Sequence, residues 1–269
     1  MFVRKLDRET AIRLALTIEY EGTRYHGFQY QDNASNIQEE LENSIYKFTG
    51  EVVRVKAAGR TDSGVHAIGQ VISFDTDTRH NPETFVNGLN HYLPEDIAVR
   101  EAVRVPESFD PRRDAVSRVY KYTIRNSKVP SPIQRRIATE IKADLDILEM
   151  KKGASLYLGT HDFRKFSAPI KGDGFSSVRK ILRSELMKKN EILEYTIEGN
   201  AFLYHQVRRM VGALVDVGRG ALTLDDLKQM IRGVGDSVAH TLPAQGLCLR
   251  EVRYERPPLF NRVATRHLY

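Results

Sequence analysis

Residues 59–67, with the sequence Gly59-Arg60-Thr61-Asp62-Ser63-Gly64-Val65-His66-Ala67, hold a single carboxylate, Asp62, in a short polar stretch. The runs on either side, residues 52–57 and 70–74, are apolar and rich in β-branched residues, so they predict two strands joined by a loop. The glycines of the loop allow a tight turn and a close backbone approach to a ligand. Arg60 is suited to bind a phosphate or to stabilise an ionised carboxylate. A plain hairpin loop whose aspartate only caps the turn is the structural alternative.

Outward from this loop, the first half of the chain predicts the order β-α-β-β-α-β, which is typical of the split ferredoxin-like unit. Ser35 is the expected N-cap of the first helix, and Gln38 completes a capping box. Asn81 and Pro82 predict the start of the second helix, whose apolar stripe includes Tyr92. The expected elements are a strand at 13–20, a helix at 35–49, strands at 52–57 and 70–74, a helix at 82–92 and a strand at 97–105.

The second half of the chain predicts a similar series of elements. We therefore expect an α+β protein of two ferredoxin-like or RRM-like units with mainly antiparallel sheets, joined around a central RNA-binding cleft. The expected domains are 1–107, which carries the Asp62 loop, and 108–269, which completes the site. The expected elements are strands at 116–124, 178–187, 192–198 and 247–254, and helices at 145–158, 203–217 and 224–231 with Thr223 as the last N-cap.

Composition narrows the class of partner. The chain has 269 residues, a formal net charge of +6 and a pI near 9.3, which favours a polyanionic ligand. Arginine outnumbers lysine by 27 to 14, and arginine is the better residue for bidentate phosphate contacts and base stacking. The one cysteine, Cys248, excludes an intrachain disulfide and a cysteine-based zinc site. The charged residues 1–8 and the lack of a long apolar run predict a soluble, cytoplasmic protein.

Other segments mix aromatic, amide and basic side chains that suit RNA contacts, at residues 20–31, 117–122, 199–212 and 242–247. In the strand-like segment 117–122, a period of two places Arg118, Tyr120 and Tyr122 on one face. A cross-strand aromatic pair is an equally good interpretation for Tyr122.

The segment 199–212 runs from a strand into a helix with a buried apolar stripe, from which Arg208 can project. Its neighbour Arg209 is expected to be an exposed cation near phosphate. His205 is expected to be a packed residue without a chemical role. For the last segment, 242–247, the structural alternative to an RNA contact is a plain turn before the final strand.

Taken together and in this order, the segments resemble the motifs of the TruA family of tRNA pseudouridine synthases, from about residue 14 to residue 254. Phe28 stands where that family often has tryptophan, and residues 126–136 depart from its pattern. The resemblance implies that Asp62 is the catalytic aspartate, that Tyr120 lies against the target base and that Arg208 pairs with the carboxylate. It also implies an isomerase that acts on uridines 38, 39 or 40 of the tRNA anticodon arm, as a homodimer.

Isomerisation of uridine adds and removes nothing, so no cofactor or metal is required. Asp62 can attack C1′ of the ribose or C6 of the base, or remove the C2′ proton to give a glycal; the family resemblance favours the last. Arg24, Arg60 and Arg118, with the basic residues 262–267, are candidate phosphate contacts.

Two other classes of function remain open at this point. A non-catalytic RNA-binding protein explains the charge and the aromatic residues but not a carboxylate on the path of an anionic ligand. A hydrolase or metal site built from Asp62 and His66 lacks further ligands. The chain has no phosphate-binding P-loop motif and no convincing dinucleotide-binding motif.

Overall fold

The computed structural model describes residues 11–168, 176–234 and 239–255. The chain forms two compact units, one from the described parts of Met1–Val116 and Leu249–Tyr269, the other from those of Ser117–Cys248. These limits differ from the expected domains 1–107 and 108–269, because the boundary falls later and the final strand joins the first unit. No helix in the described ranges is long and apolar enough to cross a membrane.

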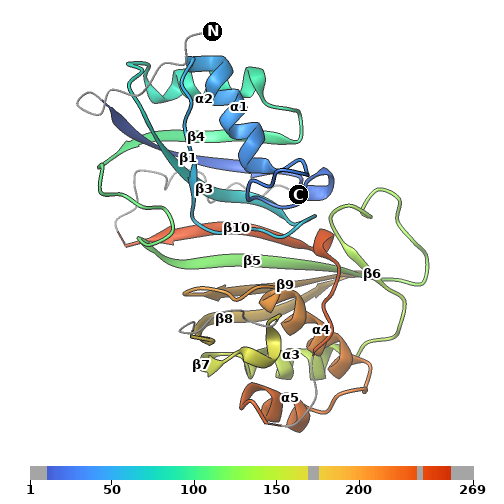
Figure 1. Ribbon diagram of the computed structural model, residues 1–269. Helices are drawn as coiled ribbons and strands as arrows, with labels where there is room; N and C mark the ends of the chain where they lie inside the picture. Colours follow the sequence, from blue (N-terminus) through green and yellow to red (C-terminus); the bar gives the residue numbers. More distant parts are fainter. Residues whose placement is uncertain (1–10, 169–175, 235–238, 256–269) are drawn as a thin grey trace. The chain divides into compact units, whose positions relative to one another are not determined.

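The first unit is built on an antiparallel sheet with the order β4-β1-β3, and β10 follows β3. Leu16 of the central strand lies opposite Ile72 on one side and Ala102 on the other. Two helices lie next to this sheet (Figure 1), and Phe85 of the second packs against Phe74 of β3 and Phe48 of the first. The elements are β1 (Ile12–Tyr20), α1 (Ile37–Thr49), β2 (Lys56–Ala57), β3 (His66–Thr76), α2 (Pro82–Tyr92), β4 (Ile97–Val105) and β10 (Leu247–Tyr254).

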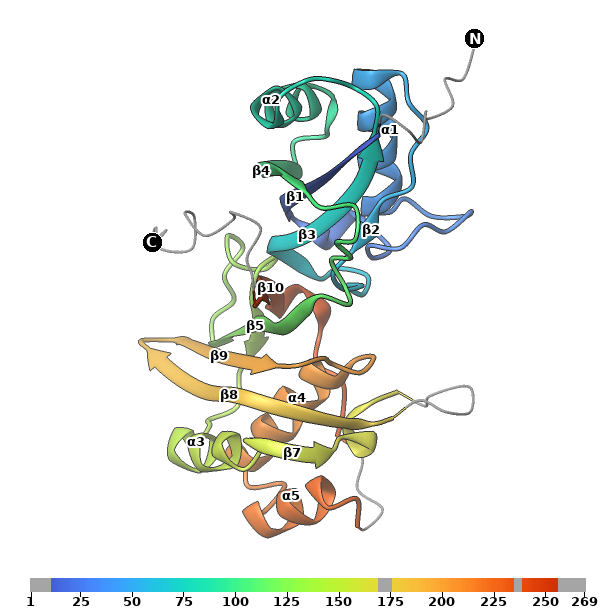
Figure 2. The ribbon, with the colours of Figure 1, turned by 90° about the vertical axis from the view of Figure 1, so that its left-hand side faces the viewer.

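In the second unit the strand order is β5-β9-β8-β7, with antiparallel neighbours, and the short β6 runs parallel to β5. Among the described residues, three α-helices belong to this unit (Figure 2). The buried Tyr157, which follows the first of them, donates from its hydroxyl to the Met210 carbonyl oxygen at 2.9 Å. The elements are β5 (Ala115–Asn126), β6 (Thr139–Ile141), α3 (Ile147–Ser155), β7 (Gly159–Asp162), β8 (Val178–Lys189), β9 (Ile192–Gly199), α4 (Gln206–Gly218) and α5 (Leu224–Ile231).

The expected α+β class with mainly antiparallel sheets is confirmed. The predicted caps are confirmed at Asn81, whose side chain accepts from the Thr84 N–H, and at Thr223, which forms a capping box with Asp226. Gly50 ends the first helix in the left-handed conformation, which favours glycine.

Three details of the first half were wrong. The cap of α1 is Asn36, whose side chain accepts from the Glu39 N–H, while the Ser35 hydroxyl donates to the Arg24 carbonyl oxygen. The strand at 52–57 shrinks to its last two residues, in part because the Val55 N–H bonds to the Glu42 carboxylate instead of a neighbouring strand. Tyr92 is 41% exposed, because it lies in the last turn of α2 and is not on the buried stripe.

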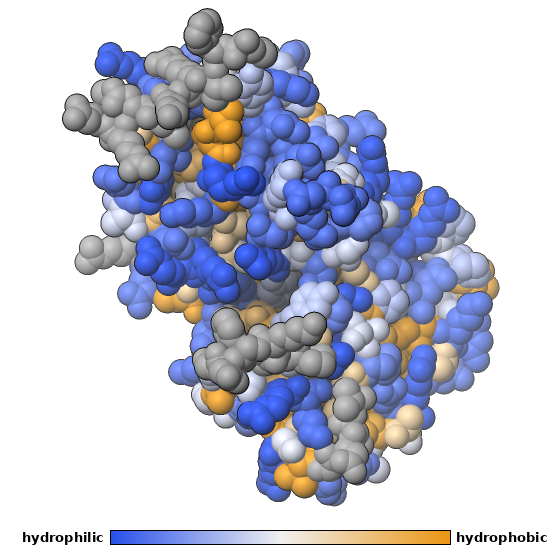
Figure 3. Space-filling view, in the orientation of Figure 1, coloured by the Kyte–Doolittle hydropathy of each residue, from blue (hydrophilic) through white to orange (hydrophobic). Residues whose placement is uncertain are grey.

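On the face shown in Figure 3, hydrophilic side chains predominate and apolar ones are scattered among them.

The short strands β6 and β7 were not expected from the sequence; they are only 3 and 4 residues long. Segments this short carry too few residues to show a period of two.

Candidate active site

Asp62 lies in the loop between β2 and β3 and is half-buried. The Val65 N–H donates to the Asp62 carbonyl oxygen at 3.1 Å, which closes a tight turn. Gly64 adopts a φ of +77°, a conformation that favours glycine, so the turn depends on this residue. The sequence-predicted hairpin loop is therefore present, with its carboxylate at the turn.

The Asp62 loop is held by the segment that follows β1. The Phe28 N–H donates to the Thr61 carbonyl oxygen at 3.1 Å, and the Gly64 N–H donates to the Tyr25 carbonyl oxygen at 3.3 Å. Gly27 comes so close that a methyl group on it would lie 2.7 Å from the Thr61 oxygen. The backbone of one predicted motif thus fixes the backbone of the other.

Side chains complete this contact between the two motifs. The Tyr20 hydroxyl, buried in the unit, lies 2.8 Å from the Thr61 hydroxyl. The Ser63 hydroxyl donates to the Tyr25 carbonyl oxygen at 3.2 Å. The hydroxyl pair of Tyr20 and Thr61 was missed in the sequence, where both positions look like ordinary strand or loop residues.

His66 has a structural contact in this unit. Its Nδ1 atom accepts a hydrogen bond from the Gly22 N–H at 3.0 Å, and the ring is buried. A methyl group on Gly22 would lie 2.0 Å from the Val65 carbonyl oxygen, so the two segments are in direct contact. Among the described residues, no group of three or more histidine, cysteine or carboxylate side chains is arranged to hold a metal ion. The hydrogen bond from Gly22 occupies Nδ1, one of the two ring nitrogens of His66 that could bind a metal.

The two candidate phosphate-binding arginines of this unit, Arg24 and Arg60, differ in their surroundings. Arg24 is 71% exposed in its side chain and pairs with Asp96 at 3.2 Å. Arg60 is exposed, and the structure shows no ion pair for it among the described residues. Tyr25 also donates to Asp96, at 2.5 Å; burial and then this carboxylate raise the pKa of Tyr25. Arg60 is therefore the more available cation beside the loop.

In the second unit, the two tyrosines of β5 are both buried but differ in their contacts. Tyr120 packs edge to face against Phe202, with ring centroids 5.3 Å apart. Tyr122 lies opposite Tyr195 of β9 in the sheet register, and its hydroxyl donates to the Pro243 carbonyl oxygen at 2.7 Å. Burial raises the pKa of Tyr122, so the hydroxyl stays protonated as a donor. Tyr122 thus has the structural role that the sequence left open.

Arg208 projects from the first turn of α4 and donates from Nε to the Leu242 carbonyl oxygen at 2.7 Å. The Leu242 N–H returns a hydrogen bond to the Arg208 carbonyl oxygen at 3.4 Å. A methyl group on Gly212 would lie 2.3 Å from the His240 carbonyl oxygen, so the segment before β10 lies directly on the helix. Gly246 in turn lies against the ring of Tyr122. Three predicted motifs therefore meet around Arg208 and Tyr122.

Two arginines of this unit are placed differently from expectation. Arg118 is 8% exposed and donates to the Asn200 carbonyl oxygen at 2.9 Å, which is a poor position for a phosphate contact. Arg209 is half-buried; its Nε donates to the Thr241 hydroxyl at 3.1 Å and its NH1 to the Ser167 carbonyl oxygen. The expectation of an exposed Arg209 was wrong, because the segment around Thr241 covers it.

His205 lies directly before α4, where its backbone and its ring both have unusual surroundings. It precedes α4 with a φ of +63°, and its ring stacks on Tyr204 at 3.8 Å. A residue other than glycine in this region stores backbone strain. The basic residues 262–267, a further phosphate candidate, lie outside the described residues.

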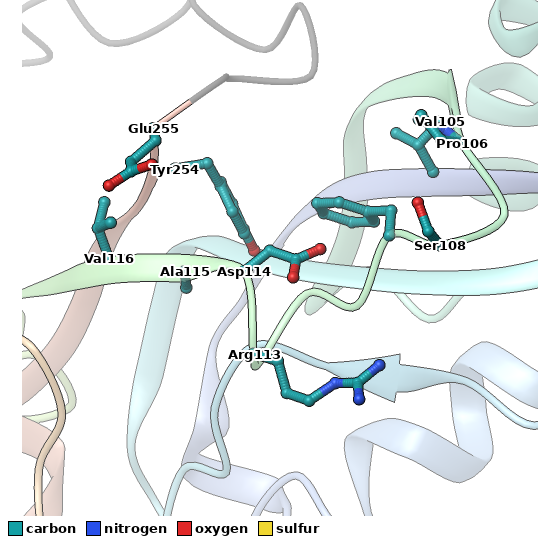
Figure 4. Close-up of a pocket in the computed structure, with 10 residues that line it drawn as sticks. Val105, Pro106, Ser108, Arg113, Asp114, Ala115, Val116, Tyr254 and Glu255 are labelled. Atoms are coloured by element: carbon teal, nitrogen blue, oxygen red, sulfur yellow. The ribbon is translucent and has the colours of Figure 1, made fainter.

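A separate hollow of about 750 Å³ lies in the first unit (Figure 4). Phe109 and Tyr254 line it with ring centroids 5.4 Å apart, together with Arg113, Asp114 and Glu255. None of the six candidate site residues lines this hollow. It is therefore distinct in its residues from the Asp62 loop.

Comparison with known proteins decides the family. A family described as tRNA pseudouridine synthase matches residues 16–112 and 154–255. The chain belongs to the tRNA pseudouridine synthase family. The matched ranges include Asp62, Arg24, Arg60 and Arg208, whereas Arg118 and Tyr120 lie between them.

Curated relatives agree. The chain is 39% identical over 244 residues to tRNA pseudouridine synthase A of Ruminiclostridium cellulolyticum, covering 90% of this chain and 99% of the relative. It is 41% identical over 243 residues to the enzyme of the same name from Geotalea daltonii, covering 90% and 99%. The match to the Exiguobacterium sibiricum enzyme is 40% over 243 residues, covering 90% and 96%. The family resemblance inferred from the motifs is confirmed.

Solved structures give a weaker match. An archaeal box H/ACA Nop10–Cbf5 complex aligns with a TM-score of 0.36 and 11% identity, covering 90% of this chain and 47% of that one. A similarity at this level has no bearing on the assignment of residues.

Proposed function

We propose that this pseudouridine synthase isomerises uridine 38, 39 or 40 in the anticodon arm of tRNA, with Asp62 as its essential carboxylate. The observation that supports this most directly is the Asp62 loop. Its backbone is tied to the segment after β1, and Asp62 is half-buried beside the exposed cation Arg60. A carboxylate fixed in this way is suited to act on one atom of a bound nucleoside.

The reaction breaks the bond from N1 of the base to C1′ of the ribose and forms a bond from C5 to C1′. The base turns between these steps, and the proton on C5 leaves while N1 gains one, so atoms and electrons balance. Asp62 can form a covalent bond to C1′ or C6, or remove the C2′ proton. All three routes need its carboxylate ionised, and none consumes a second reactant.

Two residues of the second unit are assigned to the same step. Tyr120 is proposed to lie against the target base, where its ring, held by Phe202, is a flat apolar contact. Arg208 is proposed to pair with Asp62, since a guanidinium stabilises the ionised form of a carboxylate. Its Nε hydrogen bond to Leu242 fixes the direction of the side chain in advance.

The test is release of tritium from tRNA labelled at C5 of uridine. The wild-type protein is expected to release tritium, and site mapping places the product in the anticodon arm. Asp62→Asn is expected to lower release by at least about 10³-fold, while the dissociation constant for tRNA changes little. Asp144→Asn removes a carboxylate of the same kind that is 93% exposed, and is the matched control. Near wild-type release by Asp62→Asn would contradict the assignment.

We further propose that the enzyme works in the cytoplasm as a homodimer whose two subunits share one tRNA. Residues 129–137 expose Val129, Ile133 and Ile137, three aliphatic side chains that suit a contact between copies. Light scattering of the purified protein is expected to give the mass of two chains. Ile133→Asp is expected to shift it toward one chain, and a wild-type protein that is monomeric at micromolar concentration rules out the dimer.

A further inference from the structure

Tyr30 and Arg54 form an exposed pair in the first unit. The guanidinium carbon of Arg54 lies 5.2 Å from the centre of the Tyr30 ring, within the range of a cation–π contact. Tyr30 is 39% exposed and the Arg54 side chain 66% exposed. An aromatic ring and a guanidinium plane are thus both open to a ligand at one place.

Polar side chains of α1 hold this pair in place through hydrogen bonds. The Tyr30 N–H donates to Oε1 of the buried Gln38 at 3.0 Å, and Gln38 Nε2 donates to Glu42 at 2.8 Å. Arg54 donates to the same Glu42 carboxylate at 3.0 Å. Glu42 also accepts from the Val55 N–H at 3.0 Å, so one carboxylate fixes the segment that carries Arg54. The pair is anchored before any ligand binds, which reduces the entropy lost on binding.

Tyr30 follows closely after a segment that contacts the Asp62 loop. Gly27 and Phe28 contact Thr61 directly, and Tyr30 follows only two residues after Phe28. Three extended residues span at most about 10 Å, which limits the distance from Gly27 to Tyr30. A nucleotide next to one bound at Asp62 is therefore within reach of the ring.

We propose that Tyr30 and Arg54 bind an unpaired base of the RNA substrate by stacking, at a position beside the target uridine. Single-stranded bases stack on aromatic rings and guanidinium planes, and every base offers such a face. The positive charge of Arg54 also favours the adjoining phosphate. The inference rests on the proposed function, since it assumes that RNA reaches the Asp62 loop.

Binding of wild-type and variant protein to an anticodon-arm RNA tests this. Tyr30→Ala is expected to weaken binding about 10-fold, a typical loss for one stacked base. Tyr30→Phe keeps the ring and is expected to bind within about twofold of wild type. Tyr92→Ala, which removes a tyrosine with almost the same exposure from α2, is the matched control and is expected to leave binding unchanged.

A set of RNAs with one base removed at each loop position sharpens the test. At one position, removal of the base is expected to weaken binding to wild type about 10-fold but to have no further effect on Tyr30→Ala. Thermal unfolding of each variant, followed by circular dichroism, shows whether the fold is kept. Unchanged binding by a folded Tyr30→Ala, or additive losses at every position, overturns the inference. Failure of the wild type to release tritium overturns the proposed function instead.

Discussion

The Asp62 loop and the Arg208 site are held in place by different kinds of contact. Around Asp62 the contacts are mostly between backbone groups, and glycines allow the approach. Around Arg208 a charged side chain, a buried tyrosine and a packed helix hold the segment before β10. The loop is therefore most sensitive to added atoms, and the Arg208 site to deleted ones.

The largest expected effect is that of an added methyl group at the loop. Gly27→Ala places a methyl 2.7 Å from the Thr61 oxygen at a φ of +98°. We expect a loss of roughly 2–6 kcal/mol in the free energy of unfolding, and a fall in turnover of at least about 100-fold. Urea unfolding and tritium release measure the two quantities.

Gly50→Ala is the control for this substitution. Its φ of +75° imposes the same kind of backbone strain, but no atom lies within 4 Å of the added methyl. We expect a loss of about 1–2 kcal/mol and normal turnover. Equal effects of the two variants would show that the close approach to Thr61 is not important.

Truncation of the Arg208 side chain is expected to lower turnover. Arg208→Ala is expected to lower kcat about 100-fold and to change the tRNA dissociation constant less than about threefold, because the side chain is proposed to hold the carboxylate and not the RNA. Arg219→Ala, at the exposed C-terminal end of the same helix, is the control. A loss confined to tRNA affinity would contradict the pairing of Arg208 with Asp62.

Tyr122→Phe tests the buried hydroxyl beside Arg208. It leaves the Pro243 carbonyl and the Thr139 hydroxyl without their partner, and we expect a loss of about 1–3 kcal/mol in stability near pH 7.

The same variant has a pH signature. Burial raises the pKa of Tyr122 above its ordinary value near 10, so the unfolded chain releases this proton first. Stability from this group is complete below about pH 10 and falls as pH rises further. Tyr122→Phe is therefore expected to lose less stability than wild type as the pH rises from about 10 to 11. Urea titrations of the wild type and of Tyr122→Phe at a series of pH values measure the difference.

The smallest expected effect is that of removing one hydroxyl group that contacts the loop. Tyr20→Phe removes the partner of the Thr61 hydroxyl, 2.8 Å away, and should cost about 1 kcal/mol. Tyr20→Phe with Thr61→Val is expected to cost less than the sum of the single changes, since both remove the same bond. Strict additivity in urea unfolding would show that the two hydroxyls do not interact.

Local patterns in the sequence predicted most helices and strands, along with the Asp62 loop, because caps, turns and apolar periods depend on near neighbours. They led to Ser35 as the cap of α1 in place of Asn36, since both residues are good caps and the contact of Ser35 with Arg24 is not visible in the local sequence. The burial of Arg118 depends on Asn200, which lies 82 residues further along the chain. Such long-range contacts leave no local signal.

The assignment of β10 to the first unit was also not visible in the local sequence, because it depends on a long-range contact. It depends on the close approach of Gly69 in β3 to Arg250, where a methyl group would lie 2.3 Å from the backbone oxygen. The distance between Asp62 and Arg208, by contrast, stays a prediction from the family resemblance. Motif order along a chain does not fix the separation of two side chains in different units.

The division of the chain has a consequence for its synthesis. Ser117–Cys248 is one continuous stretch, whereas the first unit also includes the described residues 249–255. A ribosome therefore delivers every residue of the second unit before the first unit can receive its last strand. Until then, among the strands that the structure describes, β3 has β1 along one edge and the two-residue β2 along the other. Open strand edges pair with strands of other chains. Truncated products of interrupted translation are therefore expected to aggregate through their N-terminal part, which contains the open edge of β3.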